Sequence, residues 1–283
     1  MSNNIALAEK FLPVLDAAYK KASLSSILDA ATQVNFDGTK TVKIMKVTTT
    51  GMGDYSRTNG YAKGNAKVEW ESMELNEDRS AELEVDRMDD EETLGQAFGM
   101  VVDEFHRVNV GSELDAYRFA KYASTPGISS KAAALADGAA VIAALREGTT
   151  AMDEAEVPAD GRILFITPTH KGVVDDMDTT KSKEVFKRFA AVIEIPQTRF
   201  YTGITLNSGV DSWGYTKAAD AVDINFMIVA KSAVVQAKKL ANPKIFTPDE
   251  NQTKDAWKFQ YRLYHDALVY ENKKSGVYVH KSV

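Results

Sequence analysis

Residues 90–123 decide the fold, and they read DEETLGQAFGMVVDEFHRVNVGSELDAYRFAKYA. Apolar side chains recur at steps of three and four residues, which is typical of a helix with one buried face. Acidic residues at its start favour a helix N-terminus, and Thr125-Pro126-Gly127 predicts its end. The apolar stripe consists of Leu94, Phe98, Val101, Val102, Phe105, Val108, Leu114, Tyr117 and Ala120. We therefore predict one long helix over residues 90–123, with Leu94, Phe98, Val101 and Phe105 in the core.

Such a helix would cross the whole body of the protein. With a rise of about 1.5 Å per residue it would be roughly 50 Å long. A compact body formed by 283 residues has a diameter of about 50 Å. A rod across a flat body suits an assembly subunit better than an enzyme built around a pocket. Gly99 and Gly111 weaken the helix locally and predict where it bends.

Composition narrows the class of protein. The chain has no cysteine, which excludes disulfides and thiolate chemistry and suits a reducing cytoplasm. Its net charge is −6, and it has no basic cluster interleaved with aromatic residues, which argues against specific nucleic-acid binding. The N-terminus has no secretion-signal pattern, and no apolar run approaches the roughly 20 residues that a membrane span needs. We therefore expect a globular protein with no membrane partner.

Residues 37–89 predict strands. Three runs alternate apolar and polar side chains, at residues 41–44, 67–71 and 81–86. Between the first two runs lies a stretch with four glycines, at positions 51, 53, 60 and 64. Glycine-rich sequence of this kind is typical of a flexible tip. We predict an extended hairpin that projects from the body.

The charges of this region are unevenly placed. Residues 37–67 hold six basic and two acidic groups, whereas residues 68–89 hold nine acidic and two basic groups. One interpretation is cross-strand pairing within a single hairpin. The other is complementarity between the hairpin and the body of an adjacent subunit, which would set the register of assembly. The candidate inter-subunit contacts are Arg57, Lys63, Lys67, Glu69 and Glu71.

The remaining chain predicts an α/β layer that returns to strands. Residues 129–148 read as an alanine-rich helix, with Ser129 or Ser130 as N-cap and Gly148 as C-terminal stop. Residues 162–167 and 223–231 read as buried strands, and Pro168 starts a helix. Residues 257–263 and 277–279 read as a hairpin with one aromatic face, which we expect to cover the long helix. At the N-terminus, residues 5–15 predict a short helix, followed by a second apolar segment around Leu28.

The sequence contains no recognisable catalytic or metal-binding motif. The four histidines lack the spacing of metal ligands, and His106 is expected in the core or at its boundary. The chain has no GxSxG elbow, no complete GxGxxG fingerprint and no phosphate-binding P-loop. We therefore predict no catalytic residue, cofactor site or metal site, and no enzyme activity.

The order of the elements resembles the major capsid protein of tailed double-stranded DNA bacteriophages, whose fold is shared with encapsulins and the herpesvirus capsid floor. The runs that carry the resemblance are VPADGRILFITPT at 157–169, INFMIVAKSAVVQAKK at 224–239, KIFTPDEN at 244–251 and WKFQYRLYHDALVYENKKSGVYV at 257–279. The resemblance implies an α+β fold in five regions. They are an N-terminal arm at 1–36, an extended loop at 37–89, a peripheral domain with the spine helix at 90–127, an axial domain at 128–222, and the β part of the peripheral domain at 223–283.

The resemblance also implies a function. The chain would be a structural protein that self-assembles, as hexamers and pentamers, into an icosahedral shell around the phage genome. Its partners would be copies of itself, a portal and weakly bound packaged DNA. A separate scaffolding protein is possible, because arm-like sequence directly follows Met1. Assembly would occur in the bacterial cytoplasm, and the product would be a virion. The alternatives are an encapsulin-like compartment shell and, from another class, a metabolic α/β enzyme.

Overall fold

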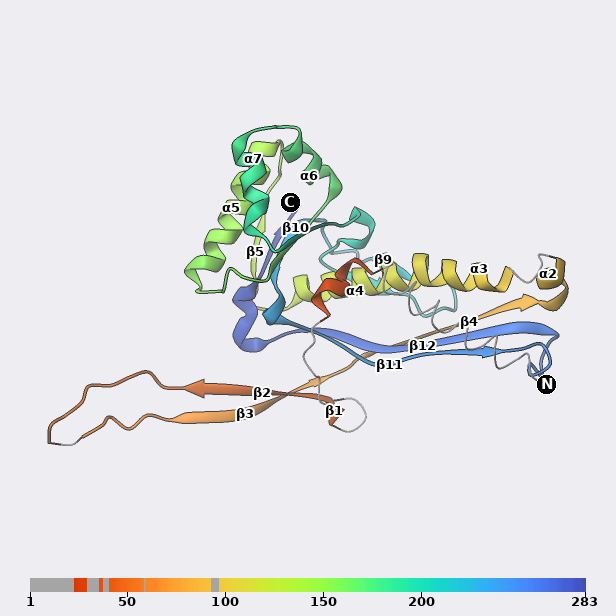
Figure 1. The fold of residues 1–283 in the computed structure, drawn as a ribbon, viewed down its shortest axis with the longest axis horizontal. Coiled ribbons are helices and arrows are strands. Elements are labelled where there is room, and N and C mark those ends of the chain that lie inside the picture. The colour runs from red at the N-terminus through yellow and green to blue at the C-terminus, as the bar shows by residue number, and fades with distance from the viewer. Residues whose placement is uncertain (1–22, 30–35, 38–40, 59, 93–96) are drawn as a thin grey trace.

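The structure is a computed structural model, and it describes residues 23–29, 36–37, 41–58, 60–92 and 97–283. Within these ranges the chain is α+β, with its strands arranged in four sheets. Figure 1 shows three parts: a projecting hairpin, an elongated layer of long strands beneath a helical rod, and a compact sheet with helices packed on it. The helix predicted at residues 5–15 and the predicted core residue Leu94 lie outside the described residues. No helix in the described ranges is long and apolar enough to span a membrane.

The projecting part is a hairpin of two strands with a short third strand at its base. β2 (Thr41–Thr49) pairs with β3 (Ala66–Glu74), and β1 (Phe36–Asp37) pairs with β2. The hairpin extends to the left in Figure 1, away from the rod and its sheet, which extend to the right. The predicted pairing of the strands around residues 41–44 and 67–71 is confirmed.

The elongated layer is a three-stranded antiparallel sheet beneath a helical rod. The strands are β4 (Glu77–Asp86), β12 (Ala256–Val269) and β11 (Val234–Phe246), with β12 in the middle. The rod consists of α3 (Ala97–Glu104), a π-helical segment η2 (Phe105–Val110) and α4 (Gly111–Ser124), and α2 (Arg87–Glu92) precedes it. Alternation along β12 places Phe259, Tyr261 and Leu263 on one face, where they form a core with Phe98 and Val102. The prediction that this aromatic face covers the long helix is confirmed.

The helix is not α-helical throughout, and this corrects the sequence-based prediction. The buried carboxylate of Asp90 accepts a hydrogen bond from the backbone N–H of Phe98 at 3.2 Å, so it caps the start of α3. Further along, the N–H of Gly111 donates to the carbonyl oxygen of His106, five residues back, which is π-helical spacing.

The core-facing side of the rod also differs from the prediction. Phe98 and Val102 are buried and Phe105 is partly buried against the same cluster, whereas Val101 is 40% exposed. Neighbouring helical residues point about 100° apart, so Val101 and Val102 cannot both face the sheet. Val102 lies four residues after Phe98 and takes that position. Placing Val101 in the core was therefore wrong, and Val108 is likewise exposed.

The compact part is a five-stranded mixed sheet. Its order is β5 (Ser129–Ala132), β13 (Val277–Lys281), β10 (Ile224–Ala230), β6 (Arg162–Ile166) and β7 (Ala191–Glu194). All residues of β6 and β10 are buried, as their apolar runs predict. The helices of this part are α5 (Gly138–Glu154), α6 (Pro168–Asp175) and α7 (Thr180–Val185). The remaining elements are η1 (Leu24–Leu28), η3 (Phe186–Arg188), η4 (Gln197–Arg199), β8 (Ile204–Leu206), β9 (Tyr215–Lys217), η5 (Lys231–Ala233) and η6 (Glu271–Gly276).

The C-terminal strands do not form the predicted hairpin. β12 pairs with β11 and β4, whereas β13 pairs with β10 and β5 in the other sheet. η6 carries the chain between the two sheets. As a consequence, β10 and β13 complete the same sheet as β5, β6 and β7. The expected boundary between the axial domain (128–222) and the β part of the peripheral domain (223–283) therefore does not coincide with an edge of this sheet.

The helix after residue 128 also begins and ends elsewhere than predicted. Ser129 and Ser130 lie on β5, and the side chain of Asp137 caps α5 by accepting a hydrogen bond from Ala140 N at 2.8 Å. Gly148 lies inside α5 rather than at its end. A Cβ atom at Gly148 would lie 2.8 Å from Cδ1 of Tyr278, so the glycine permits close packing of α5 on the sheet.

Candidate functional site

The hairpin carries an exposed apolar face. Met45 lies opposite Trp70 and Val47 lies opposite Val68 in the β2–β3 register, and directly opposite residues project from the same side of a sheet. All four side chains are between 55% and 59% exposed. We call Met45, Val47, Val68 and Trp70 the apolar hairpin face. Contiguous exposed apolar surface of this kind marks an interaction site.

The opposite side of the hairpin is polar. Lys67 forms an ion pair with Glu69 on the same strand. Closer to the body, the ammonium of Lys46 lies 2.8 Å from a carboxylate oxygen of Glu271 in η6, and this hydrogen bond raises the pKa of Lys46. The two sides of the hairpin thus have different chemistry, and the polar side is tied to the chain's own body at its base.

The candidate contact residues divide between the tip and the polar side. Arg57 and Lys63 are exposed in the tip, and Lys67 and Glu69 are exposed on β3. Glu71 lies on the same strand and is partly buried. Of these residues, the structure brings Lys67 and Glu69 together within one chain. The apolar hairpin face, on the other side of β2 and β3, was missed, although alternation in residues 45–47 and 68–70 could have indicated it.

The acidic residues between positions 77 and 86 do not belong to the hairpin. They lie on β4, and β12 of the same chain supplies much of their counter-charge. Arg262 lies 2.5 Å from Asp78, and Lys258 lies 3.1 Å from Glu84, whose pKa is lowered by hydrogen bonds from Lys254 and Lys258. The hairpin itself, residues 41–74, holds five basic and four acidic groups. Within the hairpin β2 has two basic groups, and β3 has three acidic groups and one basic group, so the charge difference between the limbs persists but is smaller than over residues 37–89.

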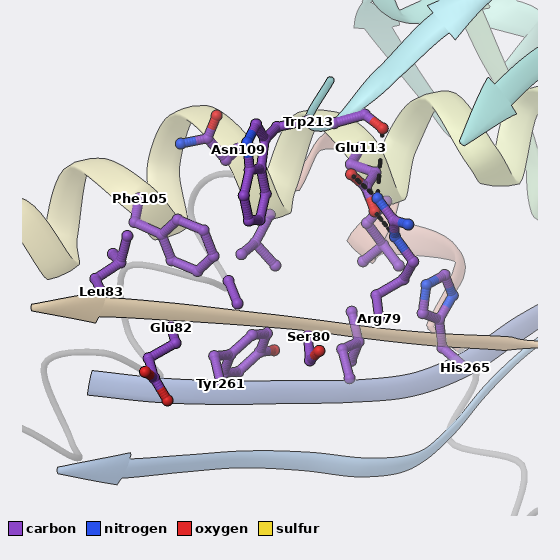
Figure 2. A pocket seen from close by; sticks show the side chains of 15 residues that line it. Arg79, Ser80, Glu82, Leu83, Phe105, Asn109, Glu113, Trp213, Tyr261 and His265 are labelled. Carbon is purple, nitrogen blue, oxygen red and sulfur yellow. Dashed lines mark hydrogen bonds and ion pairs between the residues drawn. The ribbon is translucent and has the colours of Figure 1, made fainter. Parts of the chain in front are cut away.

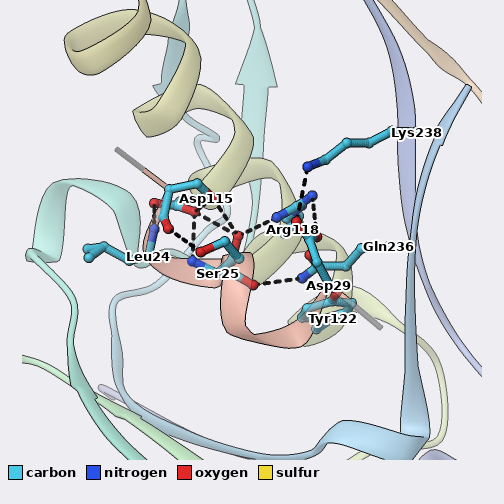
Figure 3. Close-up of polar contacts among 10 residues, drawn as sticks. Leu24, Ser25, Asp29, Asp115, Arg118, Tyr122, Gln236 and Lys238 are labelled. Atoms are coloured by element: carbon cyan, nitrogen blue, oxygen red, sulfur yellow. Dashed lines mark hydrogen bonds and ion pairs between the residues drawn. The ribbon is translucent and has the colours of Figure 1, made fainter. Parts of the chain in front are cut away.

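A buried ionic network holds the described N-terminal segment against the body (Figure 3). The carboxylate of Asp115 on α4 is fully buried, and it accepts hydrogen bonds from Leu24 N at 2.9 Å and from Ser25 N at 3.0 Å. Ser23 Oγ and Ser25 Oγ donate to the same carboxylate, and Arg199 lies 3.3 Å from it. Asp115 therefore satisfies the backbone donors at the start of η1.

Arg118 continues the network on the next turn of α4. Its guanidinium is buried, donates to Ser25 Oγ at 2.7 Å and pairs with Asp29 at 3.2 Å. Lys238 on β11 pairs with the same Asp29 at 3.1 Å. Gln236 donates to the carbonyl oxygen of Ser25. The segment that leads out of residues 1–22 is thus fixed to both the rod and the long sheet.

Three histidines are buried in the core. Burial lowers the pKa of His106 to about 4, of His265 to about 3 and of His280 to about 4. His106 packs between Phe259 and Tyr261, and neither of its ring nitrogens has a hydrogen-bond partner in the described chain. The expectation that His106 is a core histidine is confirmed. No group of three potential metal ligands is present among the described residues.

These histidines predict acid sensitivity. An unfolded histidine titrates near pH 6.5, so below that pH the unfolded chain binds protons that the folded chain cannot. We expect the free energy of unfolding to fall between pH 6.5 and pH 5 by about 1.4 kcal/mol per pH unit for each buried histidine. Urea unfolding at pH 7.5, 6.0 and 5.0 measures this slope. His106→Gln should make the slope shallower, and an unchanged slope would contradict the assignment.

The fold is that of known capsid proteins. No protein-family model and no curated protein matches the chain. Among solved structures, it is similar to a virus-like particle from Pyrococcus furiosus, with 13% identity over 96% of this chain and 98% of that one and a TM-score of 0.60. The mature capsid of bacteriophage PhiM1 gives 12% identity, 90% and 89% coverage and a TM-score of 0.58. The capsid of the cyanophage P-SCSP1u is 13% identical over 90% of this chain and 87% of that one, with a TM-score of 0.57. The chain therefore has the major capsid fold of tailed phages.

Proposed function

We propose that this chain is the major capsid protein of a tailed bacteriophage and self-assembles into an icosahedral shell around the double-stranded DNA genome. The apolar hairpin face carries the proposal. A hairpin whose four apolar side chains are more than half exposed is poorly stabilised by its own chain. A copy of the same subunit would cover it, and repeated head-to-tail contacts of this kind close into rings.

The proposal assigns a role in the shell to each part of the chain. Residues 1–36 are the arm, rooted in the network around Asp115, and the β2–β3 hairpin is the extended loop that laps a neighbour. Arg57 and Lys63 at the tip, with Lys67, Glu69 and Glu71 on β3, lie where they would contact that neighbour. The chemistry is non-covalent association rather than catalysis, in the host cytoplasm and then in the virion.

Other partners follow from the likeness to capsid proteins. Because the net charge of −6 opposes binding to DNA, contact with the packaged genome would be weak and independent of sequence. A portal at one vertex and a separate scaffolding protein complete the expected partners. The alternative is an encapsulin-like compartment shell. The several phage capsids among the similar structures favour the phage shell. The nucleic-acid content of purified particles distinguishes the two.

The hairpin tip offers a test that separates folding from assembly. Replacing residues 51–64 with an Asn-Gly turn should leave the circular dichroism spectrum and melting temperature unchanged, because exposed tips contribute little to a core. The same variant should give no particles by electron microscopy under conditions in which the wild type forms shells. Intact shells from the variant would contradict the lapping role. Loss of both fold and particles would show that the hairpin belongs to the subunit's own core.

A further inference from the structure

A cleft lies between the helical rod and the long sheet. It has a volume of about 310 Å³, and its apolar walls include Phe105, Leu114, Tyr261 and Leu263. The loop between β8 and β9 covers one end, and Figure 2 shows the indole of Trp213 lying at this opening beside Asn109. Trp213 is 71% exposed. The cleft is thus an aromatic-lined hollow within a single subunit.

The loop over the cleft is held in place by Arg79. Its guanidinium donates to the carbonyl oxygens of Asn207 at 2.7 Å and Gly214 at 3.3 Å, at the two ends of this loop. It also donates to both carboxylate oxygens of Glu113 on the rod, at 2.7 and 3.1 Å. Because these bonds are internal, Arg79 does not need an outside partner, and the opening has a fixed shape.

One polar atom in the cleft wall is unsatisfied. His265 is buried and lines the cleft beside Arg79 (Figure 2). Its Nδ1 has no hydrogen-bond partner in the described chain. Burial lowers its pKa to about 3, so at neutral pH the ring is uncharged and Nδ1 can accept a hydrogen bond. The nitrogen has no surface open to the cleft, so an occupant would meet only the ring and its apolar neighbours on this side.

The size of the cleft limits what can enter. An α-helix with its side chains is about 10–12 Å across, and an entering strand would bring backbone groups that the apolar walls cannot satisfy. An engineered cavity of about 150 Å³ accepts benzene, so a cleft of about 310 Å³ accommodates one or two aromatic rings. The occupant is therefore of side-chain size.

The hairpin tip of this same chain presents such side chains. Tyr55 and Tyr61 pack edge to face with ring centroids 5.2 Å apart, and they are 62% and 88% exposed. In Figure 1 the hairpin extends away from the rod, so the tip is directed away from its own cleft. Tip and cleft are therefore complementary in size and aromatic character.

We propose that Tyr55 and Tyr61 at the hairpin tip of one copy insert into the cleft of a second copy. This inference rests on the proposed function and assigns the surface that receives the hairpin. The rings would stack among Phe105, Trp213 and Tyr261. Because the tip and the cleft lie on different parts of the subunit, the contact is heterologous and repeats from one copy to the next.

Engineered cysteines test the contact directly, since the chain has none of its own. We expect Tyr61→Cys combined with Asn109→Cys at the cleft opening to form disulfides between copies in assembled particles. A non-reducing gel should then show a ladder beyond the dimer, because each copy donates one tip and receives another. The matched control pairs Tyr61→Cys with Lys187→Cys, which lies on an exposed site in η3. No ladder from the first pair, or an equal ladder from the control, would overturn the proposal.

Truncating the aromatic tip gives an independent readout. Tyr55→Ala with Tyr61→Ala should raise the concentration needed for assembly at least tenfold without changing the melting temperature. Thr58→Ala, an exposed residue of the same tip, should have no effect. If the double variant assembles at the wild-type concentration, the tip–cleft contact is wrong and the shell function stands. If the wild type forms no particles, the proposed function itself fails.

Discussion

Trp70→Glu should abolish shell assembly and leave the subunit folded. Trp70 is the largest side chain of the apolar hairpin face, lies opposite Met45 and is 59% exposed in the single chain. Burial of a large apolar side chain at an interface contributes about 2 kcal/mol or more. Losing 2 kcal/mol weakens each contact about thirtyfold, and a carboxylate on a covered apolar face adds a desolvation cost. Because every subunit repeats the contact, particles should disappear at concentrations where the wild type assembles.

A matched variant on the other side of the hairpin controls for added charge. Thr48→Glu introduces the same charge on β2, opposite Lys67 and on the polar side. It should reduce assembly far less than Trp70→Glu, because its carboxylate lies beside Lys67 and is not placed on the apolar hairpin face. Sedimentation and electron microscopy measure assembly, and thermal melting by circular dichroism measures folding. Equal assembly of the Trp70→Glu and Thr48→Glu variants would show that the apolar hairpin face is not an interface.

Asp115→Ala should be among the most destabilising single substitutions in the body. The buried carboxylate accepts hydrogen bonds from two backbone N–H groups and two serine hydroxyls, and it pairs with Arg199. Its removal leaves these buried groups without an acceptor. We expect a loss of about 3–5 kcal/mol in the free energy of unfolding and a fall in melting temperature on the order of 10 °C.

The exposed helix cap provides the comparison for this loss. Asp137→Ala removes a carboxylate that caps α5 at the surface, and it should cost only about 1 kcal/mol. Urea unfolding of both variants measures the difference, and hydrogen exchange should show faster exchange at Leu24 and Ser25 in Asp115→Ala. A loss of less than 1 kcal/mol for Asp115→Ala would mean that the network does not hold the arm root.

The periodicity of apolar residues predicted which side of a helix or strand is buried, and hence the contacts made by that side. Phe98 lies on a helical stripe and Phe259 on an alternating strand, so each pattern specifies a buried side, and the two sides meet in one core. The buried runs of β6 and β10 were equally recognisable. Such runs have no preferred face, however, and therefore do not reveal their neighbours. That is why the pairing of β13 with β10, rather than with β12, was not predictable.

The cap of α3 and the buried network depend on side chains that are not neighbours in sequence. Asp90 caps α3 eight residues later, and Asp115 meets Ser25 across ninety residues. Neither relation has a short-range signature. Gly148 was misread as a helix end, because glycine occurs both at helix ends and where a helix packs closely on a neighbour. The position of Tyr278 beside Gly148 shows that the second role applies here. The apolar hairpin face was similarly hidden, since alternation shows that a strand has two sides but not which side is left uncovered.

Electron cryomicroscopy of particles assembled from the purified wild-type chain tests the central claim most directly. The account predicts closed icosahedral shells in which a neighbouring copy covers Met45, Val47, Val68 and Trp70. A stable 31.1 kDa monomer at every concentration and salt condition would contradict it. So would a particle in which this hairpin face is open to solvent.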